Sequence, residues 1–159
     1  MSHITIKKAK REEINDVLWF IRKLAEYEKM LPEVTATPEM LEEWIFNRGS
    51  AEVVFIEEND VKVGFVLYFY NFSTFVGKSG LYIEDLFVLP EHRGKGYGKA
   101  LMVYLAKKAE EKGLGRMEWT CLDWNEKSIA FYKSLGAVPM DEWTNYRLTE
   151  DGIRHLAQE

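Results

Sequence analysis

The sequence predicts an α/β (α+β) domain, a three-layer sandwich in which helices flank a mixed central sheet of about six or seven strands. Stretches whose apolar residues alternate, as in strands, interchange along the chain with stretches whose apolar residues recur at helical spacing. The four prolines fall between these stretches, where they end elements rather than interrupt them. Because 159 residues is the usual size of one domain, we expect a single domain over residues 1–159.

The first third of the chain predicts one strand and two helices. Residues 3–9 alternate as a strand does, and apolar residues recur at helical spacing from Ile14 to Ala25. Thr37 followed by Pro38 is typical of an N-cap and a first helical residue. Gly49 is expected to end this second helix.

The middle of the chain predicts three strands and a long helix. The expected strands are residues 52–57, 62–70 and 81–89, and the expected helix is 96–112. The third strand is the most apolar, so we expect it at the centre of the sheet, ending at Pro90.

The last third predicts two strands and two short helices. Residues 116–122 are expected to form a strand, and Asn125 to cap a helix that Gly136 ends. Residues 137–148 are expected to be extended, and a short helix follows them.

Composition narrows the class of protein. The net charge of −5 disfavours nonspecific nucleic-acid binding, although it is compatible with a positively charged partner. Because the chain has a single cysteine, Cys121, it cannot form an intramolecular disulfide. A nucleophilic role for Cys121 would need a histidine base, and none of His3, His92 and His155 lies in a triad motif. The polar residues 1–10 lack the apolar core of a signal peptide, and no run approaches the roughly 18 apolar residues of a membrane helix. We therefore expect a cytoplasmic protein without a membrane partner.

A glycine-rich turn from Arg93 to Gly98 follows a predicted strand and opens the long helix. Its glycines let the backbone approach a ligand closely, and unpaired N–H groups at the start of a helix attract an anion. Arg93 and Lys95 add positive charge, so the turn suits a pyrophosphate. It is neither a P-loop nor a dinucleotide fingerprint, because both spacings fail. By itself, the turn is equally compatible with a helix entry that binds nothing.

The stretch Leu86–Gly98 resembles the acetyl-CoA signature of the GCN5-related N-acetyltransferase (GNAT) superfamily. That signature is R-x-x-G-x-G after a strand that ends in an apolar-Val-apolar-Pro run. Asn125 followed by Ala130–Ala137 fits the second half of the same family, and the resemblance covers the whole chain. It implies a GNAT-like sandwich, acetyl-CoA as co-substrate, no metal and a homodimer.

A narrower resemblance points to the spermidine/spermine (diamine) and thialysine acetyltransferases. Leu24–Glu28, Leu81–Val88 and Asp123–Asn125 carry it. Ser73-Thr74 ahead of a glycine is more similar to the thialysine branch. The segment 136–143 departs from the polyamine enzymes, because it is shorter and has Asp-Glu-Trp where they have Glu-Gly-Trp.

This resemblance implies direct transfer of an acetyl group from acetyl-CoA to a primary amine of a small cationic molecule, a polyamine or a thialysine-like amino acid. Two other functions stay open: acetylation of a protein N-terminus or lysine, and a noncatalytic acyl-CoA-binding regulatory module.

Two residues are candidates for the chemistry. Tyr132 shares one helical stripe with Asn125 and Ser128, and a phenol with a pKa near 10 stays protonated and can donate to a leaving thiolate. The resemblance implies that Glu84 binds and deprotonates the amine, directly or through water. Glu84 and Asp85 are neighbours on a strand and point to opposite faces unless a bulge intervenes.

The resemblance also implies the binding residues. The cofactor contacts are Leu86, Phe87, Val88, Arg93, Gly94, Lys95, Gly96, Tyr97, Gly98, Lys99, Asn125, Glu126, Lys127 and Ser128. Acidic and aromatic side chains suit a cationic amine, although each alone is also typical of a solvated surface. The substrate contacts we expect are Tyr27, Glu28, Glu84, Asp85, Glu118 and Trp143, with Asp141 and Glu142 as further candidates.

Overall fold

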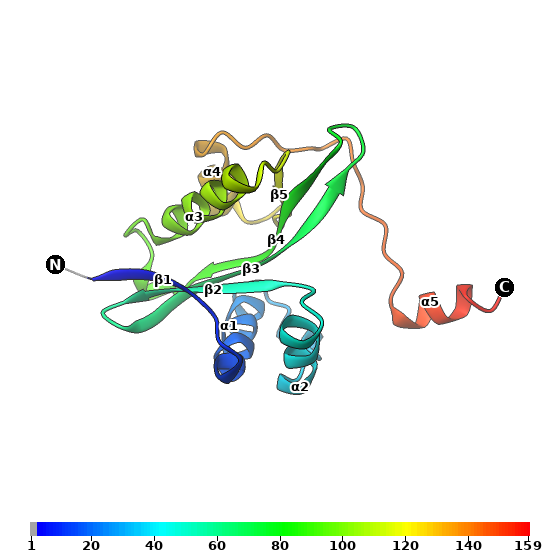
Figure 1. Ribbon diagram of the computed structural model, residues 1–159, viewed down its shortest axis with the longest axis horizontal. Helices are drawn as coiled ribbons and strands as arrows, with labels where there is room; N and C mark the ends of the chain where they lie inside the picture. The colour runs from blue at the N-terminus through cyan, green and yellow to red at the C-terminus, as the bar shows by residue number, and fades with distance from the viewer. Residues whose placement is uncertain (1–2) are drawn as a thin grey trace. The chain divides into compact units, whose positions relative to one another are not determined.

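A computed structural model describes residues 3–159, which fold as two compact units, one ending at Thr120 and the other spanning Cys121–Glu159. The first unit is built on a five-stranded sheet in the order β1-β2-β3-β4-β5 (Figure 1). The strands are β1 (Ile4–Lys8), β2 (Glu52–Glu58), β3 (Val61–Ser73), β4 (Lys78–Val88) and β5 (Met117–Trp119). β1 to β4 pair antiparallel and β4 pairs parallel with β5, so the predicted mixed sheet is confirmed.

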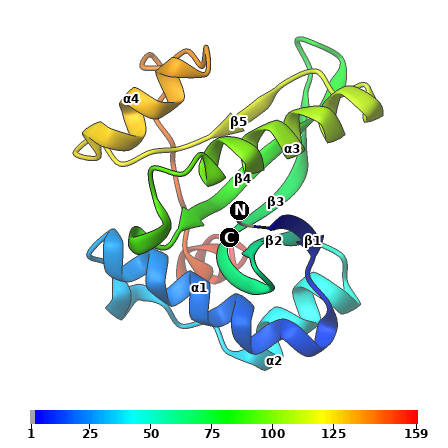
Figure 2. The same cartoon turned by 90° about the vertical axis from the view of Figure 1, so that its left-hand side faces the viewer.

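Three helices cover the sheet of the first unit on both faces: α1 (Ile14–Tyr27), α2 (Pro38–Leu41) and α3 (Tyr97–Lys112). α1 and α2 lie on one face and α3 on the other (Figure 2). On the first face, Phe20 of α1 packs against Phe55 and Phe65, with ring centroids 5.7 and 5.4 Å away. Burial of such apolar surface is the main force that holds the layers together. The three layers are therefore present within this unit.

The start and end of α2 show how local sequence sets a helix. The Thr37 hydroxyl accepts a hydrogen bond from the Met40 N–H at 3.2 Å, which confirms the predicted N-cap. After Leu41 the chain continues as a π-helix over Glu42–Asn47. This wider turn shifts the apolar stripe, so Ile45 is buried while Trp44 is half exposed.

The predicted strand count of six or seven is not confirmed, because the part of the chain that the structure describes contains five strands. Residues 137–148, which we expected to be extended, contain no strand. A strand needs a backbone partner, and the Trp143 N–H instead closes a turn on the Met140 carbonyl at 3.2 Å. β4 has a partner on each side, but the middle strand is β3.

The Cys121–Glu159 unit contains two helices, α4 (Glu126–Ser134) and α5 (Glu150–Leu156). The Asn125 side chain accepts a hydrogen bond from the Ser128 N–H at 3.3 Å, so this residue caps α4 as predicted. Gly136 follows the helix at φ 90°, a left-handed conformation that favours glycine. Across residues 3–159, no helix is both long and apolar enough to cross a membrane.

Candidate active site

A β-bulge in β4 decides where its two carboxylates point. Leu67 of β3 pairs with Asp85, but the next residue, Tyr68, pairs with Ile83, so Glu84 is the extra residue of the bulge. A bulge interrupts the alternation of side chains between the two faces of a sheet. From the sequence we expected Glu84 and Asp85 to face opposite sides of the sheet unless a bulge intervenes. A bulge is present, so the two residues need not face opposite sides.

Asp85 belongs to the face that α1 covers. It lines a cavity of about 190 Å³ together with Glu28 at the end of α1 and Glu33 in the segment that follows. Apolar side chains supply much of the remaining wall, among them Ile21 and Leu24. A small cavity with apolar walls and convergent carboxylates is typical of a site for a compact cationic ligand.

The charges in this region repel one another. Burial, together with the charges of Glu84 and Glu28, raises the pKa of Asp85 to about 7. Burial and the charge of Glu84 also raise the pKa of Glu28. Within residues 3–159, none of these three carboxylates forms an ion pair. A bound cation would relieve both the repulsion and the burial penalty. We refer to Glu28, Glu84 and Asp85 as the carboxylate cluster.

Immediately after the bulge, β4 presents a backbone edge. β5 pairs with β4 only over Leu81–Ile83, and among the described residues of the first unit no strand pairs with that edge farther along. The Leu89 N–H bonds to the Val63 carbonyl of β3 at 2.9 Å. Because antiparallel pairing alternates, the N–H groups of Leu86 and Val88 point to the opposite, open edge. Backbone groups at this edge are therefore free of strand pairing at two of the residues that the resemblance implies as cofactor contacts.

The glycine-rich turn follows this edge and leads into α3. Gly94 and Gly96 adopt φ of 78° and 84°, and neither has an atom within 4 Å of the place where a Cβ would stand. Gly96 is the N-cap of α3 and has no side chain to cap the helix. An uncapped 16-residue helix with open space before its first turn offers N–H groups and a partial positive charge to an anion. The turn therefore fits a pyrophosphate.

The two cations expected to bind this pyrophosphate already have protein partners. The Arg93 Nε donates to the Val88 carbonyl at 2.8 Å, and its guanidinium lies over the rings of Tyr27 and Phe87, 4.5 and 5.0 Å from their centroids. The Lys95 Nζ lies 3.3 Å from a carboxylate oxygen of Glu58. Arg93 therefore joins the end of α1 to the end of β4, a structural role that the motif alone did not predict.

Tyr27, Phe87 and Tyr97 take different positions around the turn. Tyr27 and Phe87 pack together, with ring centroids 6.0 Å apart, and line a second hollow of about 420 Å³ beside Trp19 and Glu91. Tyr97 is buried at the start of α3. Of the expected cofactor residues that follow, Lys99 is exposed and Gly98 is half-buried.

The second unit holds the remaining candidates for cofactor and acid roles. Asn125 is buried, while Ser128 and Tyr132 are half-buried on the α4 stripe that the sequence predicted. The Tyr132 ring packs against that of Phe131 at 5.4 Å. Glu126 and Lys127 are exposed in the first turn of α4.

The other expected substrate residues are less well placed for a cation. Glu118 on β5 is paired with Arg116, with Nε and Oε1 3.1 Å apart, so its charge is already balanced. Trp143 is 72% exposed, and Asp141 and Glu142 are exposed beside it. Two residues were missed by the sequence analysis, Glu33 in the cavity wall and Glu58 beside the turn. Glu58 had one usable signal, its position directly before Asn59 and Asp60, two residue types that favour turns.

Comparison with known proteins agrees with this geometry. The sequence model of the acetyltransferase (GNAT) family matches residues 13–137. A thialysine N-epsilon-acetyltransferase of Sus scrofa is 34% identical over 169 aligned positions, which cover 99% of each chain. An L-ornithine N5-acetyltransferase of Arabidopsis thaliana is 47% identical over 99 residues, and that match takes in 62% of this chain but only 43% of the Arabidopsis protein.

A solved structure gives the same result for the fold. An integron cassette protein from the mobile metagenome of V. cholerae is 28% identical, with a TM-score of 0.81 and coverage of 98% of both chains. Since the family match extends over residues 13–137, most of the 159 residues, the chain belongs to the acetyltransferase (GNAT) family.

Proposed function

We propose that this N-acetyltransferase moves an acetyl group from acetyl-CoA to a primary amine of a small cationic molecule, a thialysine-like amino acid or a diamine. The observation that carries the proposal is the carboxylate cluster at the bulge of β4. Glu84 lies two residues before Leu86 on the same strand, a separation of about 7 Å at the rise of a β-strand. A cationic amine held by the cluster would therefore lie near the open edge where an acyl donor can pair.

On the donor side, acetyl-CoA supplies the acetyl group as a thioester, whose C–S bond breaks as the C–N bond to the amine forms. The N–H groups of Leu86 and Val88 would hold the pantetheine arm at the edge of β4, and one of them would polarise the thioester carbonyl. Gly94 to Gly98 and the first turn of α3 would hold the pyrophosphate, with Arg93, Lys95 and Lys99 adding charge. In α4, Asn125 to Ser128 would complete the cofactor contacts.

On the amine side, Glu28 and Asp85 would bind the cationic substrate through charge pairing, with Tyr27 beside them. Glu84 would accept the proton that the attacking ammonium must lose, through a water molecule, because its exposed position at the bulge leaves room for one. The neutral amine then attacks the thioester directly, without an acyl-enzyme. The Tyr132 hydroxyl would give its proton to the departing thiolate.

The experiment that tests the function is thiol release from acetyl-CoA across an amine panel of thialysine, ornithine, lysine, spermidine, putrescine and a short lysine peptide. We expect turnover with a small diamine or diamino acid and none with the peptide. The Tyr132→Phe variant should lower kcat by about 100-fold while it leaves both KM values within a few-fold. Turnover with the peptide alone would replace the proposal with a protein acetyltransferase. Tight acetyl-CoA binding without any turnover would replace it with the regulatory module.

We also propose that the enzyme acts in the cytoplasm as a homodimer, by analogy with the resembled family. The apolar residues Val138, Met140 and Leu148 are exposed in the second unit and would be available to such an interface. Sedimentation equilibrium tests the dimer, and a monomer at micromolar concentration would contradict it.

A further inference from the structure

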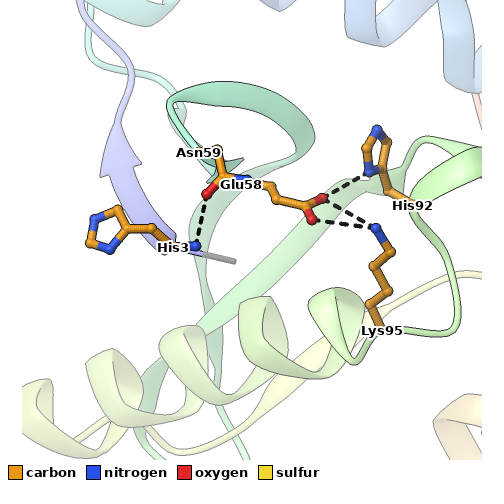
Figure 3. A network of polar contacts seen from close by, with 5 residues as sticks. All are labelled: His3, Glu58, Asn59, His92 and Lys95. Atoms are coloured by element: carbon orange, nitrogen blue, oxygen red, sulfur yellow. Dashed lines mark hydrogen bonds and ion pairs between the residues drawn. The ribbon is translucent and has the colours of Figure 1, made fainter. Parts of the chain in front are cut away.

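A network of polar contacts connects the glycine-rich turn to the hairpin between β2 and β3 (Figure 3). Glu58, the last residue of β2, has a side chain that is only 11% exposed. Its Oε2 lies 2.9 Å from His92 Nδ1, and its two oxygens lie 3.3 and 3.4 Å from Lys95 Nζ. His92 and Lys95 flank Arg93 and Gly94, so a single carboxylate holds both sides of the turn.

The Glu58 end of this network is rigid. Asn59 and Asp60 form the tight turn of the hairpin, with φ of 51° and 66°. The Asn59 N–H donates to the His3 carbonyl at 2.8 Å, and the His3 N–H donates to Asn59 Oδ1 at 2.9 Å. These bonds fix the hairpin to β1, so the position of Glu58 is set by the sheet.

At the other end, Arg93 packs over the rings of Tyr27 and Phe87, but the turn beyond it is exposed. Residues 93–96 are exposed, and the space around Gly94 and Gly96 is open. Glycines lose more conformational freedom on ordering than other residues, so a fixed conformation here needs specific tethers. The Arg93 bond to Val88 provides one tether at the start of the turn. The Glu58 contacts provide the other, at His92 just before the turn and at Lys95 within it.

We infer that Glu58 is a positioning residue for acyl-CoA binding. Its carboxylate orders His92 and Lys95, and with them the backbone that receives the pyrophosphate. The inference rests on the proposed function, because it requires the turn to bind acyl-CoA. Preorganisation of a loop strengthens binding by removing the ordering cost from the binding step.

Because Glu58 is charged, the direction in which CoA affinity changes when it is replaced tests the inference. A carboxylate beside an anion site repels the anion, so removal of that charge alone would tighten CoA binding. Removal of a tether would weaken it. The two effects oppose each other, and the inference states that the second is larger.

Glu57 provides a matched control on the same hairpin. Glu57 is buried and Glu58 is only slightly exposed, but the Glu57 carboxylate pairs with Lys7 Nζ at 3.4 Å instead of with the turn. Glu57→Gln and Glu58→Gln therefore remove the same charge from adjacent positions on one strand, but only the second removes it from the turn.

The experiment is calorimetric titration of CoA into wild type, Glu58→Ala, Glu58→Gln and Glu57→Gln, with hydrogen exchange of the ligand-free proteins over residues 92–98. We expect Glu58→Ala to weaken CoA binding about tenfold and to speed exchange in the turn. Glu58→Gln keeps an oxygen acceptor and should lose less affinity for CoA. Glu57→Gln should match wild type in both CoA affinity and exchange. At saturating acetyl-CoA, the amine KM and kcat should not change.

Tighter or unchanged CoA binding by both Glu58 variants, with unchanged exchange in the turn, would overturn the inference. If Glu58→Ala fails to fold, Glu58→Gln against Glu57→Gln still decides it, since wild-type affinity and exchange in Glu58→Gln would overturn it as well. If wild type itself does not bind CoA, the proposed function fails, and that outcome is distinct from failure of the inference.

Discussion

The two ends of the segment from the β4 bulge to α3 differ in whether their charged side chains have partners. At the bulge, Glu28, Glu84 and Asp85 repel one another, and their charge is not balanced within the described residues. Beyond the end of the strand, Lys95 is already paired with Glu58, and the Arg93 guanidinium is stacked on aromatic rings. The first region resembles a site suited to a cation, because burial and repulsion between carboxylates raise the pKa of both Asp85 and Glu28. The second is preorganised, and it offers an anion mainly backbone N–H groups.

From this difference, we expect the binding of the two substrates to depend on different kinds of residue. Amine binding should depend on side-chain charge, whereas donor binding should depend on the conformation of a glycine turn. Substitutions in the two regions should therefore change different kinetic constants.

The largest effect is expected at the bulge. Glu84→Gln removes the group proposed to accept the proton of the amine, so kcat should fall by about 100-fold near neutral pH. The acetyl-CoA KM should stay within about twofold, because the proposed role of the residue is toward the amine and not toward the anion. Rapid-mixing or steady-state thiol release measures both constants. A normal kcat would remove Glu84 from proton transfer and leave it as a binding residue at most.

A pair of variants tests the separation of the two regions directly. Glu28→Gln should raise the amine KM about tenfold, the value of one charge-assisted hydrogen bond, without a change in the acetyl-CoA KM. Lys95→Ala should do the reverse, and by less, about threefold, because backbone groups carry most of the anion binding. Measurement of both KM values for both variants in one assay tests whether the two regions act independently. If each variant changes both constants equally, the regions are not independent.

The elements that the sequence predicted well are those with local signals. The Thr37 and Asn125 caps and the glycine entry to α3 depend on residues close in the chain. The bulge at Glu84 had no such signal, because it depends on how β4 registers against β3. The Glu58 network joins positions 34 and 37 residues apart, a distance at which periodicity carries no information.

The segment 137–148, which we expected to be extended, forms no strand for a related reason. An extended pattern shows that a segment can form a strand, but not that a partner strand pairs with it. For the candidate site, the family motif predicted which residues belong together. It did not predict that Arg93 stacks on Tyr27, that Glu118 is neutralised by Arg116, or that Glu33 lines the cavity. These facts depend on side-chain packing between elements that are distant in sequence.

Acidity should weaken the amine site selectively. Because the pKa of Asp85 is raised to about 7, the residue loses its charge as the pH falls through that value. The affinity for a cationic substrate analogue should therefore fall by about fivefold between about pH 8 and pH 6, while that for CoA changes less. Calorimetric titration at both pH values measures the change. In Asp85→Asn the pH dependence should be reduced, and an equally steep dependence in that variant would assign it to another group.

An effect on stability is also expected, and its sign follows from the same pKa. The carboxyl of Asp85 has a folded-state pKa near 7 and an unfolded value of about 3.9, so between these values the folded state binds more protons than the unfolded state. The contribution of Asp85 to the free energy of unfolding therefore falls as the pH rises from about 4 to 7, and is level above that range. Asp85→Asn cannot titrate, so it should stabilise the protein by about 1 kcal/mol at about pH 8 and by almost nothing at about pH 4. Urea unfolding of wild type and variant at the two pH values measures the difference. A variant that is less stable at pH 8 would mean that the Asp85 carboxylate is held by favourable contacts, and the view of the bulge as a site lacking its cation would then be wrong.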